Sequence, residues 1–308
     1  MNQFKHKDLI SLNYLSIEEM DLIIHEADST KKGPRNTEDL KGKTLAMIFE
    51  KSSTRTRVSF ETGMYQLGGT AMYFSSKDLQ MGRGETIHDT AKVLSRYVDG
   101  IMARTFSYQT ILDLAKYSSI PIINGLTDYD HPCQILTDLF TIYEKRGELK
   151  GLTLSYIGDG NNVLHSLIQG CSRMGMNINF AYPEGYGPLE SVVNEEMEIA
   201  KKTGSKIKGM NNAADTIKDA DVIYTDTWIS MGQESDEDKK LKNFEKFQLN
   251  GDLMKKAKPE VLVMHCLPAH RGQEITDEVI DGPNSIVFDQ AENRLHTQKA
   301  ILKLLMIK

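Results

Sequence analysis

The segment Glu50–Arg57 (EKSSTRTR) contains residue types that bind anions. It follows the apolar run TLAMIF and precedes a helical pattern of Phe60, Met64 and Leu67, which Gly68-Gly69 ends. A helix that begins here would place exposed backbone N–H groups and the positive end of its dipole among hydroxyls and guanidinium groups. Cationic side chains are unfavourable at that end unless an anion binds there, so the pattern predicts a phosphate site. The alternative is a solvent-exposed basic turn.

A second polar group lies at Asp130–Gln134 (DHPCQ). Pro132 suits the first position of a helix, so His131 and Gln134 would lie about one turn apart at its start, beyond the apolar run PIIN. Open α/β sheets bind ligands at the carboxyl ends of their strands, which makes this pair a candidate for ligand binding. His131 could also be a helix cap or a surface residue.

Asp226 and Cys266 each end a later apolar run. Asp226 ends DVIYT and precedes a long polar loop with the only tryptophan of the chain, which suits a lid but also a simple turn cap. Cys266 ends VLVMH; such a cysteine is most often a small buried hydrophobe, although polar neighbours argue against a purely apolar site. A zinc site of His265, Cys266 and His270 has a spacing that fits no standard motif.

The run Gly158–Val163 (GDGNNV) follows an apolar strand pattern and opens a helical one, as a dinucleotide-binding turn would. The third glycine of that fingerprint is replaced by Val163, and the acid nearest the expected distance is Glu184, beyond a proline. A nicotinamide-dependent oxidoreductase is therefore a weak alternative.

Short apolar runs that alternate with amphipathic stretches must position these groups. They predict an α/β fold with parallel sheets covered on both faces. The charged segment Glu144–Gly151 is the natural junction of two doubly wound domains, and Ala291–Lys308 has the spacing of a helix that returns to the first domain. We expect residues 1–146 with 291–308 to form one domain and 151–290 the other. The predicted strands are Thr44–Phe49, Ala71–Phe74, Gly100–Ala103, Pro121–Asn124, Leu152–Ile157, Ile178–Tyr182, Asp221–Thr225, Val261–His265 and Ile286–Phe288.

Composition excludes several classes of function. The 308 residues include 37 Lys+Arg and 43 Asp+Glu, a net charge of −6, and the pI is about 5.8, so the chain has no global attraction for nucleic acid or anionic membranes. No apolar run is long enough to span a bilayer, and the N-terminus lacks a signal-peptide pattern. The three cysteines have no CxxC spacing. We expect a cytoplasmic protein.

Seven motifs occur in the order seen in ornithine carbamoyltransferases: SSTRTR, MART, HPCQ, DGNN, DTWISMG, HCLPAHRGQEIT and AENR. The combination covers essentially the whole chain and is highly specific, so the sequence resembles that family. The resemblance implies one domain for carbamoyl phosphate and one for L-ornithine, with a C-terminal helix that returns to the first. It implies attack of the ornithine δ-amine on carbamoyl phosphate to give citrulline and phosphate, with no metal and no organic cofactor.

The resemblance also assigns residues. It implies that Asp226, Cys266, Arg104 and His131 act in catalysis, the first two on the amine and the others on the carbonyl oxygen. It gives ornithine binding to Asn162, Asp226, Ser230 and Met231. The carbamoyl phosphate group that it implies is Ser53, Thr54, Arg55, Thr56, Arg57, Gln80, Arg104, His131, Gln134, Cys266, Leu267 and Arg294. Gln80 matches a loop that enters the neighbouring subunit's site in this family, so a homotrimer is implied.

Other substrates and roles remain as alternatives. An aspartate enzyme of the same family typically has HPLP where this chain has HCLP, and it needs cationic groups for the extra carboxylates. Putrescine and acetylornithine enzymes depart from the SMG motif, and putrescine is the closest alternative. A phosphometabolite-binding regulator is a third class. The motifs are compatible with an arginine-producing role and with the reverse direction.

Overall fold

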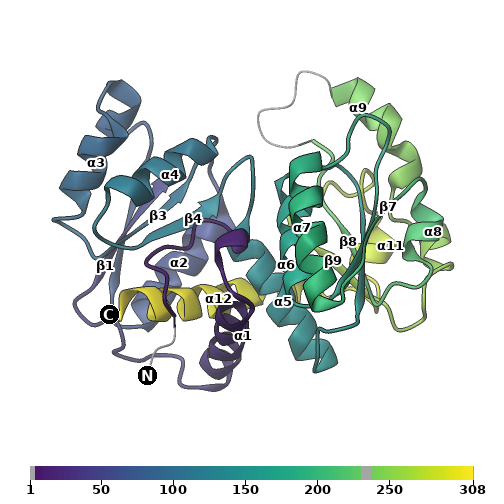
Figure 1. Cartoon of the computed structure of the whole chain (residues 1–308), viewed down its shortest axis with the longest axis horizontal. Helices are drawn as coiled ribbons and strands as arrows, with labels where there is room; N and C mark the ends of the chain where they lie inside the picture. The colour runs from purple at the N-terminus through teal and green to yellow at the C-terminus, as the bar shows by residue number, and fades with distance from the viewer. Residues whose placement is uncertain (1–3, 230–236, 308) are drawn as a thin grey trace. The chain divides into compact units, whose positions relative to one another are not determined.

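The computed structural model describes residues 4–229 and 237–307 (Figure 1). The chain divides into two compact units, Met1–Phe140 with Glu292–Lys308 and Thr141–Ala291. The boundary between Phe140 and Thr141 falls inside a helix, upstream of the charged segment Glu144–Gly151 at which we expected the junction of the domains. Each unit contains its own parallel sheet, as the alternating pattern predicted.

The sheet of the first unit has the strand order β2-β1-β3-β4, with every neighbouring pair parallel. Its strands are β1 (Thr44–Phe49), β2 (Thr70–Ser75), β3 (Gly100–Arg104) and β4 (Ile122–Leu126). The order reverses between β1 and β3, so the helical connections cover both faces and the unit is doubly wound. Strands β1, β3 and β4 are almost fully buried. Burial is expected for β1 and β3, which lie inside a parallel sheet covered on both faces, whereas β4 lies at its edge.

Helices cover both faces of this sheet. They are α1 (Ile17–Lys32), α2 (Thr54–Gln66), α3 (Ile87–Leu94), α4 (Tyr108–Tyr117), the start of α5 (Pro132–Arg146) and most of α12 (Val287–Met306), with the 3-10 turns η1 (Leu12–Tyr14) and η2 (Gln80–Arg83). Helix α12 lies close to α2, because a methyl group on Gly63 would be 3.3 Å from Lys299 and 3.6 Å from Leu302 (Figure 1). The predicted return of the C-terminal helix to the first unit is confirmed.

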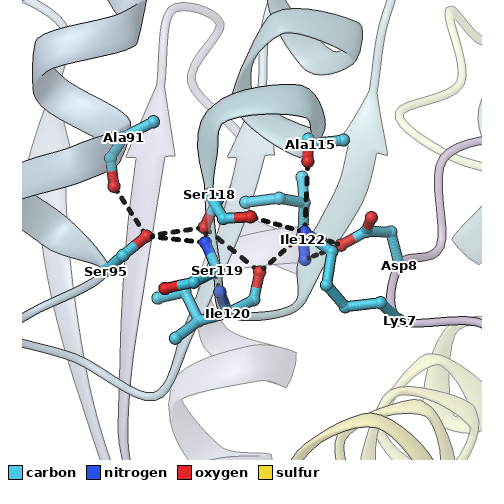
Figure 2. Close-up of polar contacts among 9 residues, drawn as sticks. All are labelled: Lys7, Asp8, Ala91, Ser95, Ala115, Ser118, Ser119, Ile120 and Ile122. Atoms are coloured by element: carbon cyan, nitrogen blue, oxygen red, sulfur yellow. Dashed lines mark hydrogen bonds and ion pairs between the residues drawn. The ribbon is translucent and has the colours of Figure 1, made fainter.

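The N-terminal segment is attached to the edge of this sheet. Leu9 forms a parallel bridge with Ile123 of β4, and Asp8 accepts the backbone N–H of Ile122 at 2.8 Å. Figure 2 shows the ammonium group of Lys7 among carbonyl oxygens at the end of α4 and in the following loop: Ala115 at 3.1 Å, Ser118 at 2.8 Å and Ile120 at 3.5 Å. Lys7 thus satisfies carbonyl groups that a helix end leaves without partners.

The sheet of the second unit has the parallel order β7-β6-β5-β8-β9. Its strands are β5 (Thr153–Ile157), β6 (Asn177–Ala181), β7 (Ile207–Met210), β8 (Val222–Thr225) and β9 (Leu262–His265). Its helices are α6 (Asn162–Arg173), α7 (Glu190–Thr203), α8 (Ala213–Ile217), α9 (Glu237–Phe244), α10 (Gly251–Met254) and α11 (Asp277–Ile280), with the 3-10 turn η4 (Glu245–Phe247). The order reverses between β5 and β8, so this unit is also doubly wound.

One strand prediction is wrong, and one strand was not predicted. Ile286–Phe288 is not a strand: α12 begins at Val287, and the burial of Val287, Gln290, Arg294 and Thr297 with exposed Phe288 follows a helical period. Strand β7 was missed because it is an edge strand, half-exposed, with a lysine and a glycine in four residues. None of the helices within the described residues combines the length and apolarity that a membrane crossing requires.

Candidate active site

The first polar group lies at the start of α2, directly after β1. Ser53 has an extended backbone (φ −160°), and its hydroxyl accepts the backbone N–H of Thr56 at 3.2 Å, so it is the N-cap of the helix. Thr54 is exposed and Arg55 half-buried, whereas Thr56 is fully buried. The predicted helix start with its serine cap is confirmed, and hydroxyl, guanidinium and backbone N–H groups gather at its positive end.

Arg294 of α12 connects this helix start to the DHPCQ segment. Its guanidinium donates to Oε1 of Gln134 at 2.6 Å and to Oγ1 of Thr56 at 3.3 Å. Gln134 is held on its other side, where its amide nitrogen donates to Asp138 at 2.8 Å. All three members of this group are buried in the first unit. The structure therefore brings together residues from α2, α5 and α12 that the sequence had placed in one carbamoyl phosphate site.

His131 lies directly before α5 and is electrostatically perturbed. Burial lowers its pKa well below the usual value, and the nearby guanidinium groups of Arg294, Arg104 and Arg55 lower it further. The imidazole is consequently neutral at physiological pH, so one ring nitrogen carries a proton and the other is an acceptor. Arg104, at the end of β3, is only 5% exposed. A buried neutral imidazole among three guanidinium groups suits the binding of an anionic or strongly polar ligand.

Asp130 supports the backbone next to His131. Its carboxylate accepts a hydrogen bond from the side chain of Asn124 at 2.7 Å and from the hydroxyl of Thr127 at 3.1 Å. Burial raises the pKa of Asp130 to about 6, although the hydrogen bonds from Ser11, Thr127 and Asn124 oppose the shift. Asp130 therefore stabilises the turn into α5 through its hydrogen bonds, but its burial makes the ionised form unfavourable.

Two predicted residues of this group have other surroundings. The guanidinium of Arg57 lies 4.0 Å from the centre of the Tyr73 ring and pairs with Glu61 at 3.3 Å on the exposed flank of α2. The side chain of Gln80, at the start of η2, is exposed. Their roles in binding stay predictions.

In the second unit, Asp226 follows β8 and Cys266 follows β9. These strands are neighbours in the sheet, so both side chains lie at its carboxyl edge. The thiol of Cys266 donates to Oδ1 of Asp226 at 2.9 Å. Asp226 is buried and Cys266 is half-buried. The polar environment that we inferred for this cysteine is present, and a thiol beside a carboxylate can hold and deprotonate an amine.

The backbone after Cys266 is held by a buried pair. Nδ1 of His265 accepts the backbone N–H of Leu267 at 2.9 Å, so the ring proton lies on Nε2, which is 3.0 Å from Oε1 of Glu274. The same Glu274 oxygen accepts the N–H of His270 at 2.6 Å. Leu267 has a left-handed backbone (φ +55°) and is followed by a cis proline. Both ring nitrogens of His265 therefore serve to shape the HCLP segment.

This arrangement bears on metal binding. Within the described residues, ligand atoms of Asp226, His265 and Cys266 lie within 4.8 Å of one another. Both ring nitrogens of His265 already form hydrogen bonds within the protein, so this histidine could bind a metal ion only if one of those bonds were broken. His270, the third member of the zinc alternative, contributes only its backbone to this group.

The GDGNNV turn is packed in a way that does not favour a dinucleotide. A methyl group on Gly160 would lie 2.2 Å from the carbonyl carbon of Gly187, and the Gly160 N–H donates to the carbonyl of Tyr186 at 2.8 Å. Gly160 is therefore explained by close backbone packing. Asp159 is paired with Lys240 at 2.7 Å.

Among the predicted ornithine residues, Asn162 opens α6 and is half-buried, while Ser230 and Met231 lie outside the described residues. The preceding residue, Asn161, was not predicted as a site residue, yet its side-chain amide donates to Oδ2 of Asp226 at 2.8 Å. The pair Asn161-Asn162 after a strand was the sequence signal for a site here. Nothing in the sequence indicated that Asn161, rather than Asn162, contacts Asp226.

Profiles of two protein domains match the chain in succession. Residues 7–144 match the carbamoyl-P binding domain of aspartate/ornithine carbamoyltransferases, and residues 150–305 match the Asp/Orn binding domain. The chain belongs to the aspartate/ornithine carbamoyltransferase family. The resemblance that the seven motifs indicated is thereby confirmed.

Members of this carbamoyltransferase family match the chain over nearly its full length. The ornithine carbamoyltransferase of Thermococcus kodakarensis is 53% identical over 97% of this chain and 96% of its own. That of Bacillus subtilis is 54% identical over 98% and 94%. The solved ornithine carbamoyltransferase of Pyrococcus furiosus superposes with a TM-score of 0.94 at 53% identity, covering 97% of this chain and 96% of its own.

Proposed function

We propose that this carbamoyltransferase transfers the carbamoyl group of carbamoyl phosphate to the δ-amine of L-ornithine, giving L-citrulline and phosphate. The observation that carries the proposal is that relatives named ornithine carbamoyltransferase have more than 50% sequence identity to this chain over nearly its full length. The two polar groups described above supply the chemistry that this reaction needs.

The predicted first domain, residues 1–146 and 291–308, binds carbamoyl phosphate. The start of α2 with Ser53, Thr54, Arg55 and Thr56 receives the phosphate, whose negative charge grows as its bond to carbon breaks. Arg104 and the neutral His131 donate to the carbonyl oxygen and stabilise the oxyanion of the tetrahedral intermediate. Gln134, fixed by Arg294, faces the carbamoyl amide.

The predicted second domain, residues 151–290, binds ornithine. The δ-amine is an ammonium ion in water and must lose a proton before its lone pair attacks the carbamoyl carbon. Asp226 with Cys266 holds this amine and takes up the proton. After attack, the carbon–oxygen bond breaks, phosphate leaves with the bonding electrons, and the second amine proton passes from the nitrogen to the departing phosphate. Asn162, Ser230 and Met231 are the remaining predicted ornithine contacts, whereas the backbone of Leu267 is a predicted contact of carbamoyl phosphate.

We further propose a homotrimer that works in the cytoplasm. Apolar side chains on α2 and the edge strand β2 are exposed in the single chain: Val58 at 52%, Tyr65 at 77% and Met72 at 45%. Such a patch suits an interface between copies, and Gln80 follows the same strand. None of the three cysteines, all within the described residues, forms a disulfide, which suits a reducing compartment.

The test is a substrate panel of ornithine, putrescine, acetylornithine and aspartate with carbamoyl phosphate, in which the products are identified. We expect citrulline from ornithine as the principal product. Turnover of putrescine or aspartate without citrulline would contradict the proposed substrate. Binding of carbamoyl phosphate without any turnover would support a regulator instead, and tight NAD(H) binding in a fluorescence titration would revive the oxidoreductase alternative.

A further inference from the structure

The side-chain amide of Asn161 accepts hydrogen bonds at its oxygen and donates one at its nitrogen, to two different sets of partners. It is the N-cap of α6, and its side-chain Oδ1 accepts the backbone N–H of Val163 at 3.0 Å and of Leu164 at 3.2 Å. Its Nδ2 donates to Oδ2 of Asp226 at 2.8 Å. One short side chain therefore joins the start of a helix to the carboxylate that we assign to the substrate amine.

The orientation of this amide is determined by its surroundings. If oxygen and nitrogen exchanged places, the NH2 group would face two backbone N–H groups and the oxygen would face a carboxylate. Both contacts would be repulsive. The cap consequently forces the donor side of Asn161 toward Asp226.

The carboxylate of Asp226 is thereby held at both oxygens. Asn161 donates to Oδ2, and the Cys266 thiol donates to Oδ1 at 2.9 Å. These donors come from the start of α6 and from the residue after β9, so rotation of the carboxylate would break both bonds.

We propose that Asn161 is a positioning residue that keeps the Asp226 carboxylate oriented toward the substrate amine. This inference rests on the proposed function, because it takes Asp226 as the group that binds the amine. Asn161 acts through Asp226, and its helix cap supplies the rigidity that the orientation requires.

The other charged and titratable groups around Asp226 come from several elements. They are Tyr156 of β5, Asp159 of the following turn, His265 at the end of β9, and Cys266; Asp159 is paired with Lys240 of α9. Asn161 is a neutral donor among these groups. Replacing it by an acid would therefore place an additional negative charge directly against Asp226.

The decisive variant is Asn161→Asp. Aspartate caps helices as well as asparagine does, so the cap is kept, while the donor to Asp226 becomes an acceptor. We expect kcat/KM for ornithine to fall roughly 10- to 100-fold, as for a lost hydrogen bond to a charged group. We expect the acid limb of its pH profile to move up by about one unit because of the second carboxylate. The KM for carbamoyl phosphate should change little.

Two further variants separate positioning from capping. Asn161→Ser keeps a capping hydroxyl that is too short to reach Asp226, so kcat/KM for ornithine should fall without movement of the acid limb. Asn250→Asp is the matched control: Asn250 caps α10 by accepting the N–H of Leu253 at 3.0 Å, outside the machinery described above. This control should retain wild-type kinetics.

The inference is overturned if Asn161→Asp keeps kcat/KM for ornithine within about twofold and an unshifted acid limb, given the effect that loss of a charged hydrogen bond should have. It is also overturned if both Asn161 variants lose thermal stability and carbamoyl phosphate binding together, which would be a purely structural role. A wild-type protein that forms no citrulline would instead contradict the proposed function itself, so the two failures are distinguishable.

Discussion

The guanidinium of Arg294 donates to Oε1 of Gln134 at 2.6 Å across 160 positions of sequence. Gln134 lies in the first turn of α5, and Arg294 lies in α12, which the chain reaches only after it has formed the second unit. The same guanidinium contacts Thr56 at the start of α2. The C-terminal helix is therefore part of the candidate carbamoyl phosphate site as well as of the packing of the first unit.

Replacing Arg294 with methionine should weaken carbamoyl phosphate binding. The change leaves the buried amide oxygen of Gln134 without this donor and removes a positive charge that faces the anion. Loss of one charged hydrogen bond predicts that KM for carbamoyl phosphate rises roughly 10- to 100-fold. Steady-state kinetics with saturating ornithine measure the effect. Glu292→Gln, an exposed change in the same helix, is the control, and equal losses in both variants would show that only helix packing is affected.

Replacing Cys266 with alanine should lower ornithine turnover while the fold is retained. The thiol is half-buried and donates to Asp226 at 2.9 Å, so its loss leaves that carboxylate with one donor fewer. We expect kcat/KM for ornithine to fall about 10-fold or more, with KM for carbamoyl phosphate little changed. Kinetics together with thermal melting measure both effects. Wild-type kinetics in the variant would show that the cysteine only fills space.

Local patterns were sufficient to predict most elements. The serine cap of α2 and Pro132 at the start of α5 were predicted from the sequence because caps and proline positions depend on a few neighbouring residues. The Ile286–Phe288 run was misassigned since β-branched residues do not distinguish a short strand from the buried face of a helix start. The Asn161–Asp226 bond could not be predicted, because it depends on how two distant strand ends meet at one sheet edge.

Replacing Lys7 with methionine should destabilise the first unit. The ammonium group of Lys7 donates to three carbonyl oxygens at the end of α4 and in the following loop (Figure 2). Because Lys7 is partly exposed, we expect a loss of only about 1 kcal/mol in the free energy of unfolding. Urea denaturation with kinetics measures it, and kcat should stay at the wild-type value. Lys5→Met, an exposed neighbour, is the control; if it costs as much, the loss reflects charge rather than capping.

Replacing Asp130 with asparagine should stabilise the protein at neutral pH. Burial raises the pKa of Asp130 to about 6 in the folded protein, above the 3.8 of an unperturbed aspartate. The folded state therefore binds the proton more tightly than the unfolded chain, so this group's contribution to stability is full below pH 4 and is lost as pH rises through 6. Asparagine removes that cost. A shift of about two units corresponds to roughly 3 kcal/mol as an upper limit, since the new amide fits the same hydrogen bonds imperfectly. Urea denaturation of both proteins should therefore show little difference at pH 4 and a more stable variant at pH 8. A variant that is less stable at pH 8 would show that the hydrogen bonds of the ionised carboxylate outweigh its burial.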